Sequence, residues 1–212
     1  MADPYDIVRE FEKTVAEFAG AKYGVAVESG SAALFLSCLH EHSDWGALNV
    51  TIPSRTYPSV ACAVINAGHR LDFFYDPWSG VYELGKMRVY DCALRLKRRM
   101  CWELEKGFQA CLSFHSKKHL AVGRGGMILT NNENTARWLR LARFDGRTET
   151  PLQDGGVEMV GWNMYMTPEQ AARGLELFRV YVNKWPDGAP DLDVEAQGYP
   201  DLSQYEFYKG GR

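Results

Sequence analysis

The stretch GVAVESGSAALFLSCL, residues 24–39, changes its pattern half-way along. Residues 24–27 are small and apolar, which indicates a short buried strand, and Ser29 and Gly30 interrupt it. Apolar residues then continue over residues 32–39, which predicts a helix directly after the strand. A strand that turns tightly into a helix is the repeating unit of an α/β fold.

The same alternation continues on both sides of this stretch. Apolar spacing predicts a helix at residues 6–21 before it. After it we expect strands at residues 49–52, 71–75, 88–90, 110–114 and 127–130, and helices at residues 56–68, 133–144 and 168–182. Asn132 and Thr167 are plausible start signals for the last two helices. Alternating strands and helices predict parallel pairing, so the expected fold class is α/β with a mostly parallel sheet.

The length and composition of the chain are those of a soluble globular protein. The chain has 212 residues, of which 46% are hydrophobic and 24% charged, enough for one sizeable core and a short tail. We therefore expect one domain over residues 1–183 and an irregular C-terminal arm over residues 184–212, which is rich in Pro, Gly, Asp and Tyr. The sequence contains no signal-peptide pattern and no long apolar run.

Charge and cysteine usage exclude some function classes. The net charge of −3 gives no overall nucleic-acid footprint, although RLKRR at residues 95–99 is a local basic run that would ordinarily be a solvated loop. The five cysteines are odd in number and lack CxxC spacing, so we expect reduced core residues and a cytoplasmic protein. His40 and His42 have no further ligands near them at metal spacing, so no metal site is expected.

Three polar features follow separate strands. Ser29, Gly30 and Ser31 occupy a strand-to-helix turn, where free N–H groups favour an anion, although such turns are common. Asp91 follows a short apolar strand, a place where an Asp is ordinarily a turn or cap residue. Lys118 comes shortly after Ser113 and before a glycine cluster that permits close approach to a bound group. An anion site, a carboxylate and an amine together suggest pyridoxal phosphate.

Five segments, in order, resemble those of the DegT/StrS sugar aminotransferases, which are fold-type-I pyridoxal-phosphate enzymes. The resemblance is collinear from about residue 8 to residue 181. The segments are YGVAVESGSAAL at residues 23–34, PSRTY at residues 53–57, VYDCA at residues 89–93, SFHSKKHLAVGRGG at residues 113–126 and GWNMYMTPEQAA at residues 161–172.

The resemblance implies a three-layer large domain, pyridoxal phosphate as cofactor, and a role for each segment. Lys118 would be the Schiff-base lysine, while Lys117 stands where the family usually has a small hydroxyl residue and would contact phosphate or substrate, or be solvated. Asp91 would pair with the pyridine nitrogen, and Tyr57 would stack on the ring. The implied cofactor-binding set is Ser29, Gly30, Ser31, Tyr57, Asp91, Ser113, Lys118 and Asn163. Asn163 would reach the phosphate of a partner subunit, which implies a homodimer with shared sites.

The chain also departs from the family pattern. Only 15 positions separate Asp76 from Asp91, where relatives insert another strand and helix, so we expect a smaller sheet. Leu94 replaces a Gln or His that usually contacts the cofactor, and Tyr165 replaces an arginine. Residues 184–212 are too few to form the small C-terminal domain of relatives, so we expect an open site that accepts larger substrates.

Three functions remain open at this point, because a fold does not decide a reaction. The first is an aminotransferase that acts on a keto-sugar, a nucleotide sugar or another small molecule. The second is a decarboxylase or lyase on a bulky substrate, such as an amino-acid-modified base in viral DNA, which would enter past basic residues. The third is a non-catalytic remnant that binds cofactor or a partner. The candidate substrate-binding residues are Arg95, Arg98, Arg99 and Arg124.

Overall fold

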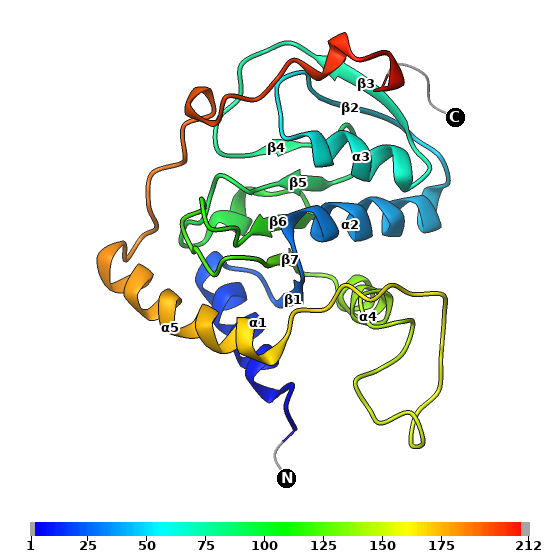
Figure 1. The fold of residues 1–212 in the computed structure, drawn as a ribbon, viewed down its shortest axis with the longest axis vertical. Helices are drawn as coiled ribbons and strands as arrows, with labels where there is room; N and C mark the ends of the chain where they lie inside the picture. The colour runs from blue at the N-terminus through cyan, green and yellow to red at the C-terminus, as the bar shows by residue number, and fades with distance from the viewer. Residues whose placement is uncertain (1–2, 209–212) are drawn as a thin grey trace.

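The computed structural model describes residues 3–208. Five strands form one sheet in the order β1–β7–β6–β5–β4, and β2 and β3 form a separate parallel pair (Figure 1). The strands are β1 (Tyr23–Val27), β2 (Asn49–Pro53), β3 (Arg70–Phe74), β4 (Tyr82–Glu83), β5 (Val89–Asp91), β6 (Gln109–Ser113) and β7 (Gly126–Thr130). The helices are α1 (Asp6–Ala19), α2 (Gly30–Trp45), α3 (Pro58–Asn66), α4 (Glu133–Ala142) and α5 (Pro168–Lys184). Short 3₁₀ helices are η1 (Met100–Glu103), η2 (Glu195–Gln197), η3 (Leu202–Gln204) and η4 (Glu206–Tyr208).

The predicted α/β class is confirmed, but the expectation of a mostly parallel sheet is wrong, because β5–β6 is the one parallel pair of the five-stranded sheet and its other pairs are antiparallel. β5 and β6 are parallel, whereas β7 lies between β1 and β6 and is antiparallel to both. The reason is the connection from β6 to β7. Residues 114–125 contain no helix that could carry the chain back across the sheet, so the chain reverses and pairs Ser113 with Gly126.

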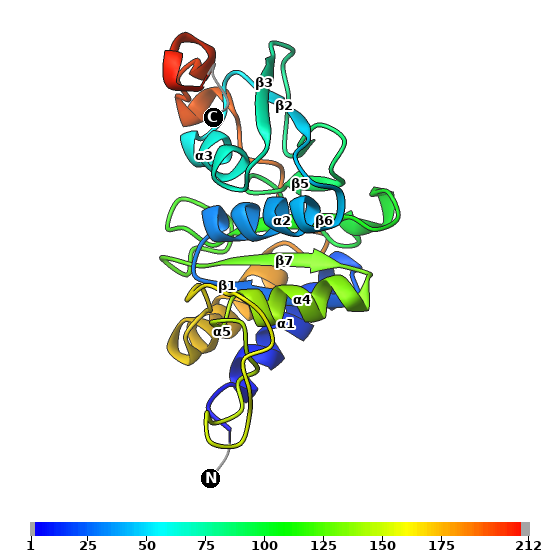
Figure 2. The same cartoon turned by 90° about the vertical axis from the view of Figure 1, so that its right-hand side faces the viewer.

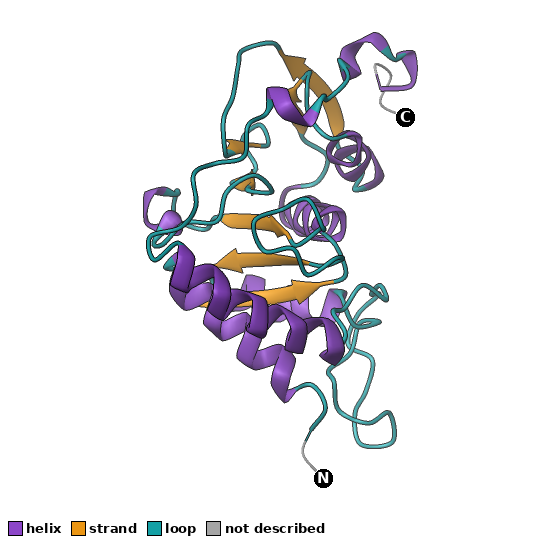
Figure 3. Cartoon of the chain, turned by 60° about the vertical axis from the view of Figure 1, so that its left-hand side comes forward, coloured by secondary structure: helices purple, strands orange, loops and turns teal. Residues whose placement is uncertain are grey.

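Helices cover both faces of the sheet, which gives three layers (Figures 2 and 3). Successive side chains on a strand point to opposite faces. On β7, Met127 and Leu129 join the buried cluster that contains α1 and α5, while Ile128 joins the cluster that contains α2, α3 and α4. The three-layer expectation is therefore confirmed.

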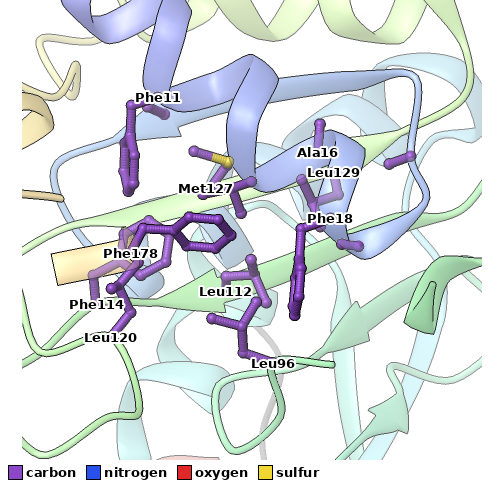
Figure 4. Close-up of a cluster of buried hydrophobic side chains, with 14 of the residues drawn as sticks. Phe11, Ala16, Phe18, Leu96, Leu112, Phe114, Leu120, Met127, Leu129 and Phe178 are labelled. Atoms are coloured by element: carbon purple, nitrogen blue, oxygen red, sulfur yellow. The ribbon is translucent and has the colours of Figure 1, made fainter. Parts of the chain in front are cut away.

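The core beside α1 supports the segment that follows β6. Figure 4 shows Phe11 and Phe18 of α1 and Phe178 of α5 among the aliphatic side chains of the strands. The ring of Phe11 lies 5.3 Å from that of Phe114, the first residue after β6, and both rings are buried. This packing holds the start of residues 114–125, which we call the lysine loop.

The predicted elements are present, with shifted ends. The helix expected at residues 32–39 extends over the whole of α2, and the helix expected from residue 56 begins at Pro58, the first helical position, which suits proline. Asn132 caps α4, and Thr167 caps α5 with a capping box, as predicted. The two-residue strand β4 was not predicted, because it is too short to show a periodic pattern.

After α5 the chain continues as the C-terminal arm, residues 185–208. Figure 1 shows it, orange to red, leaving α5 and running along the molecule to the end that carries α3, β2 and β3. The arm buries Leu202 and Tyr208 and contains only 3₁₀ turns as helical structure. The division at residue 184 stays a prediction, and residues 209–212 of the predicted arm lie outside the described residues. Within residues 3–208, none of the helices has both the length and the apolar character needed to cross a membrane.

Candidate active site

The turn between β1 and α2 lies directly against the ends of β6 and β7. A Cβ atom on Gly30 would lie 2.8 Å from Cβ of Ser113, and one on Gly126 would collide with the Ser29 carbonyl group. Both positions therefore need glycine for the backbones to approach. The contact brings the start of α2 beside the carboxyl end of β6, the edge where α/β sheets bind ligands.

The start of α2 is built to receive an anion. The Ser29 hydroxyl caps the helix by accepting a hydrogen bond from the Ala32 N–H at 3.0 Å. The hydroxyl groups of Ser31 and Ser59 are hydrogen-bonded, with 2.7 Å between their oxygens. The first N–H groups of a helix have no intrahelical partner and carry the positive end of the helix dipole. Together with the nearby hydroxyls they can bind a phosphate group.

Asp91 is the last residue of β5 and its side chain is buried. Its carboxylate accepts hydrogen bonds from the Tyr82 hydroxyl at 2.8 Å and from the Ala93 N–H at 2.9 Å. Tyr82 is itself hydrogen-bonded to the Thr56 hydroxyl at 2.6 Å. Burial raises the pKa of Asp91, against the opposing effect of these donors and of Lys118. A carboxylate has room for more than two donors, so Asp91 can still bind a protonated nitrogen.

Lys118 lies on the lysine loop, half-buried. The loop is closed at its base by hydrogen bonds between Phe114 and residues Gly123 and Gly125, and the Lys118 N–H donates to the His115 carbonyl at 2.8 Å. Burial lowers the pKa of Lys118, and the charge of Asp91 opposes this shift. Within residues 3–208 its ammonium has no hydrogen-bond or ion-pair partner. The Lys117 side chain, by contrast, is exposed.

These groups line one cavity of about 400 Å³. Of the predicted site residues it brings together Ser29, Gly30, Ser31, Tyr57, Asp91, Ser113, Lys118 and Arg124. Leu94 also lines it, and its side chain is almost fully buried. Tyr57 is 58% exposed at the cavity, which leaves its ring free for stacking.

Four predicted residues lie elsewhere. Asn163 is exposed and its side-chain amide donates to Asp145 at 3.2 Å. Arg95 binds Asp191, Arg98 donates to the Pro186 carbonyl, and Arg99 stacks on Trp102, so none of these arginines lines the cavity. Within the basic run, Arg95 is engaged by Asp191, whereas Arg98 and Arg99 keep exposed side chains, and the run does not edge this cavity.

Sequence reasoning missed several residues of the site. Tyr82 and Thr56 hold Asp91, and Trp78 and Tyr199 line the cavity. Tyr199 lies on the C-terminal arm and reaches Tyr57, with 6.3 Å between the ring centroids. No local pattern marks these residues, because their role depends on contacts between distant parts of the chain.

The residues present fit pyridoxal phosphate. The cradle at the start of α2 suits its phosphate, the buried Asp91 carboxylate suits its pyridine nitrogen, and the unpaired Lys118 amine suits its aldehyde. The Gly30 position is part of this fit, since a side chain there would fill the space beside Ser113. Leu94 offers this cavity only an apolar contact.

The fold is that of the large domain of fold-type-I pyridoxal-phosphate enzymes. Two solved structures illustrate the likeness. They are PseC from Helicobacter pylori, an aminotransferase involved in the biosynthesis of pseudoaminic acid (TM-score 0.65, 20% identity, 81% of this chain and 57% of that one), and a sugar aminotransferase from Micromonospora echinospora (TM-score 0.67, 18% identity, 84% and 61%). A model of the DegT/DnrJ/EryC1/StrS aminotransferase family matches residues 2–76 and 104–181. The chain belongs to this family.

Two curated relatives agree with this assignment. A spore coat polysaccharide biosynthesis protein of Bacillus subtilis, SpsC, is 26% identical over 79% of this chain and 55% of its own length. The GDP-perosamine synthase of Caulobacter vibrioides is 28% identical over 78% of this chain and 54% of its own length. The chain therefore spans about half the length of the curated relatives that it matches.

Proposed function

We propose that this chain binds pyridoxal phosphate through Lys118 and acts as the cofactor-binding part of an aminotransferase. The observation that carries the proposal is the meeting of three groups in one cavity: the start of α2, the buried Asp91 carboxylate and the Lys118 amine. They come from three separate segments, and the start of α2 and the Asp91 carboxylate keep capacity for hydrogen bonds beyond those made within the chain. The family match covers the start of α2 and Lys118 and supports their part of the assignment, whereas Asp91 lies outside it and rests on the geometry of the cavity.

Each residue has a distinct task in this proposal. Ser29, Ser31 and Ser113, with the first N–H groups of α2, hold the phosphate, and Tyr57 packs on the ring. Asp91 keeps a proton on the pyridine nitrogen. Bound pyridoxal phosphate supplies an electron sink that stabilises negative charge at the substrate carbon. Lys118 Nζ attaches the cofactor and is the half-buried amine of the two lysines that line the cavity. It can carry a proton to or from the substrate, and burial keeps more of it neutral.

A keto-sugar, carried by a nucleotide as in the perosamine synthase relative, is the substrate class that we propose. Decarboxylase or lyase chemistry on a bulky substrate was suggested by the expected open site and by the basic run, and the arginines of that run do not line the cavity. No observation favours that alternative or the non-catalytic remnant. The five cysteines are free, so we also propose a reducing compartment, the cytoplasm.

The proposal is tested by loading the purified protein with pyridoxal phosphate and recording the visible absorption spectrum. Wild type should show the visible absorption band of a cofactor bound to lysine as a Schiff base, and Lys118→Ala should lose it. Lys117→Ala is the matched control and should keep it. If Lys117→Ala loses the band and Lys118→Ala keeps it, the assignment of the attachment residue is wrong, and if wild type shows no band, the proposed function fails.

The reaction is tested separately by mass spectrometry of the cofactor after incubation with amino donors and keto-sugar acceptors. Pyridoxamine phosphate supports amino transfer. Released carbon dioxide with unchanged pyridoxal phosphate would instead support decarboxylation.

A further inference from the structure

Two described stretches lie outside the family match, residues 77–103 and residues 182–208. Both reach the cavity. Trp78, Asp91 and Leu94 come from the first stretch, and residues 197–200 come from the second. The two stretches also bind one another, so they form a joint wall of the cavity.

The basic run ties the beginning of the arm to the domain. The Arg95 guanidinium donates to both carboxylate oxygens of Asp191, with Nη2 at 2.6 Å, and Lys97 Nζ lies 3.1 Å from the same carboxylate. The Leu192 N–H donates to the Leu94 carbonyl at 2.9 Å. Both side chains of the Arg95–Asp191 pair are mostly shielded from solvent, and a bidentate pair of this kind sets orientation as well as distance.

A second attachment lies just beyond Tyr199. The Leu202 N–H donates to the Ser54 carbonyl at 2.7 Å, and Leu202 is 1% exposed. Arg55 donates to the Tyr199 carbonyl at 3.4 Å and its backbone bridges to that of Asp201. Tyr199 is therefore held between two fixed points rather than at the end of a free tail.

The Tyr199 ring is the arm's main contribution to the cavity. It is parallel to the Trp78 indole within 5°, with 6.5 Å between centroids, and it meets the Tyr57 ring edge-on. We call Tyr57, Trp78 and Tyr199 the aromatic wall. Burial and then the charge of Asp91 raise the pKa of Tyr199 to about 12, so its hydroxyl stays neutral beside that carboxylate.

We infer that Tyr199 is a binding residue of this cavity: its ring, held by the two attachments of the arm and backed by Trp78, contacts the flat ring of the bound group, so that the arm closes the site within one chain. The inference rests on the proposed function, because the flat ring is that of pyridoxal phosphate. It adds a residue that lies outside every segment matched by the family model.

The first experiment measures the dissociation constant of pyridoxal phosphate in protein stripped of cofactor, by quenching of aromatic fluorescence. Tyr199→Ala should weaken binding about three- to tenfold, the loss of one aromatic contact. Tyr199→Phe keeps the ring and should bind like wild type. Tyr205→Ala is the matched control, because Tyr205 lies on the same arm, is exposed and does not line the cavity, and it should also bind like wild type.

A second measurement uses the wild-type protein, so it does not depend on whether a variant folds. Hydrogen exchange of wild type should slow at residues 197–200 when pyridoxal phosphate is added, and should stay unchanged at residues 205–208. The same comparison in Lys118→Ala, with saturating cofactor, should give the same local protection, because the arm contacts the ring rather than the attachment bond.

The outcomes separate this inference from the proposed function. Weaker binding in Tyr199→Ala alone, with slower exchange at residues 197–200, supports the inference. Unchanged binding in Tyr199→Ala, equal losses in Tyr199→Phe or Tyr205→Ala, or unchanged exchange at residues 197–200 would each overturn it while wild type still binds cofactor. Absence of cofactor binding by wild type would overturn the proposed function, and the inference with it.

Discussion

Burial acts on Asp91 and Lys118 in opposite directions and for one reason. Moving either group out of water disfavours its charged form, which raises the pKa of the Asp91 carboxyl group and lowers that of the Lys118 amine. Each charge also stabilises the other, so the two shifts are held in check. A neutral amine is the nucleophilic form of lysine, so this environment suits covalent attachment.

The rate at which pyridoxal phosphate attaches to Lys118 should therefore rise with pH. The amine reacts after losing its proton, and its lowered pKa places the midpoint of the profile below the ordinary lysine value of 10.5. Growth of the visible band, followed at constant ionic strength from about pH 6 to about pH 11, which spans the ordinary lysine pKa, gives the profile. Lys117→Ala should leave it unchanged, and a midpoint at or above the ordinary value would contradict the role of burial.

Asp91→Asn should preserve the fold and cofactor attachment. It should lower turnover by roughly a hundredfold or more, because a positioned proton contributes a factor of this size to the rate. Asparagine fits the same space but carries no charge to keep the pyridine nitrogen protonated. Steady-state kinetics and circular dichroism make the comparison. Asp76→Asn, at an exposed carboxylate in the connection from β3 to β4, is the control and should be silent. Near-normal turnover of Asp91→Asn would remove this residue from the mechanism.

At the scale of elements, the site depends on how closely the β1–α2 turn approaches β6. Gly30→Ala places a methyl group against Ser113 and should destabilise the protein by about 1–3 kcal/mol. It should also weaken phosphate binding, since the start of α2 must move. Thermal unfolding and cofactor titration test both effects. Gly156→Ala is the control, because that position has open space around it and no special backbone angle. If Gly30→Ala binds cofactor like wild type, the close approach is not needed for the site.

The packing of α2 on β6 buries a second titratable group. Glu41 of α2 accepts a hydrogen bond from the Gln109 side chain at 2.9 Å, and His40, Asp44 and Arg88 are the charged or titratable groups around it. Burial raises the pKa of Glu41 to about 7, from an ordinary value of 4.5. The folded protein thus holds a proton there that the unfolded chain releases.

The stabilisation due to the protonated Glu41 should be complete below pH 4.5 and should be lost as the pH rises through about 7. Wild type should therefore lose unfolding free energy between these values relative to Glu41→Gln, which cannot ionise. Urea unfolding of both proteins across this range gives the difference. Glu10→Gln, on the exposed side of α1, should run parallel to wild type. Parallel curves for wild type and Glu41→Gln would show that the buried carboxyl group does not titrate in this range.

At the scale of the whole molecule, Asn163 is the one predicted cofactor residue that the cavity does not contain. It is exposed and lies on the segment before α5, which leaves it available to a second chain. In a two-fold dimer each chain would both give and receive this residue.

We therefore expect a dimer in light scattering, and Asn163→Ala should weaken cofactor retention about tenfold, the loss of a hydrogen bond to a charged group. Asn134→Ala, an exposed Asn on α4, should have no effect. A monomer that binds pyridoxal phosphate as tightly at low as at high protein concentration would contradict shared sites.

Much of the fold and the centre of the site could be predicted from local sequence. The strand–turn–helix at residues 23–45 follows from a change in apolar period at a Ser-Gly pair, and the caps at Asn132 and Thr167 follow from side chains that satisfy open N–H groups. Ser29 and Gly30 could be proposed for a similar reason, whereas the choice of Lys118 over Lys117 follows from the family resemblance of residues 113–126. Ser29 and Gly30 lie in a segment whose neighbours along the chain define its backbone, so the pattern is readable within a few residues.

The rest was decided by tertiary structure, because it depends on which distant groups become neighbours. β7 lies next to β6 and antiparallel to it because the lysine loop contains no helix that could carry the chain back across the sheet. The basic run, which suggested a substrate surface, instead binds the arm through Arg95 and Asp191, 96 positions apart. Packing also causes the burial that raises the pKa of Asp91, and it brings Tyr199 against Tyr57. Burial of a single polar side chain and pairing between distant residues leave no periodic trace in a sequence, unlike the burial of an apolar face. The same local sequence is compatible with either partner or with solvent.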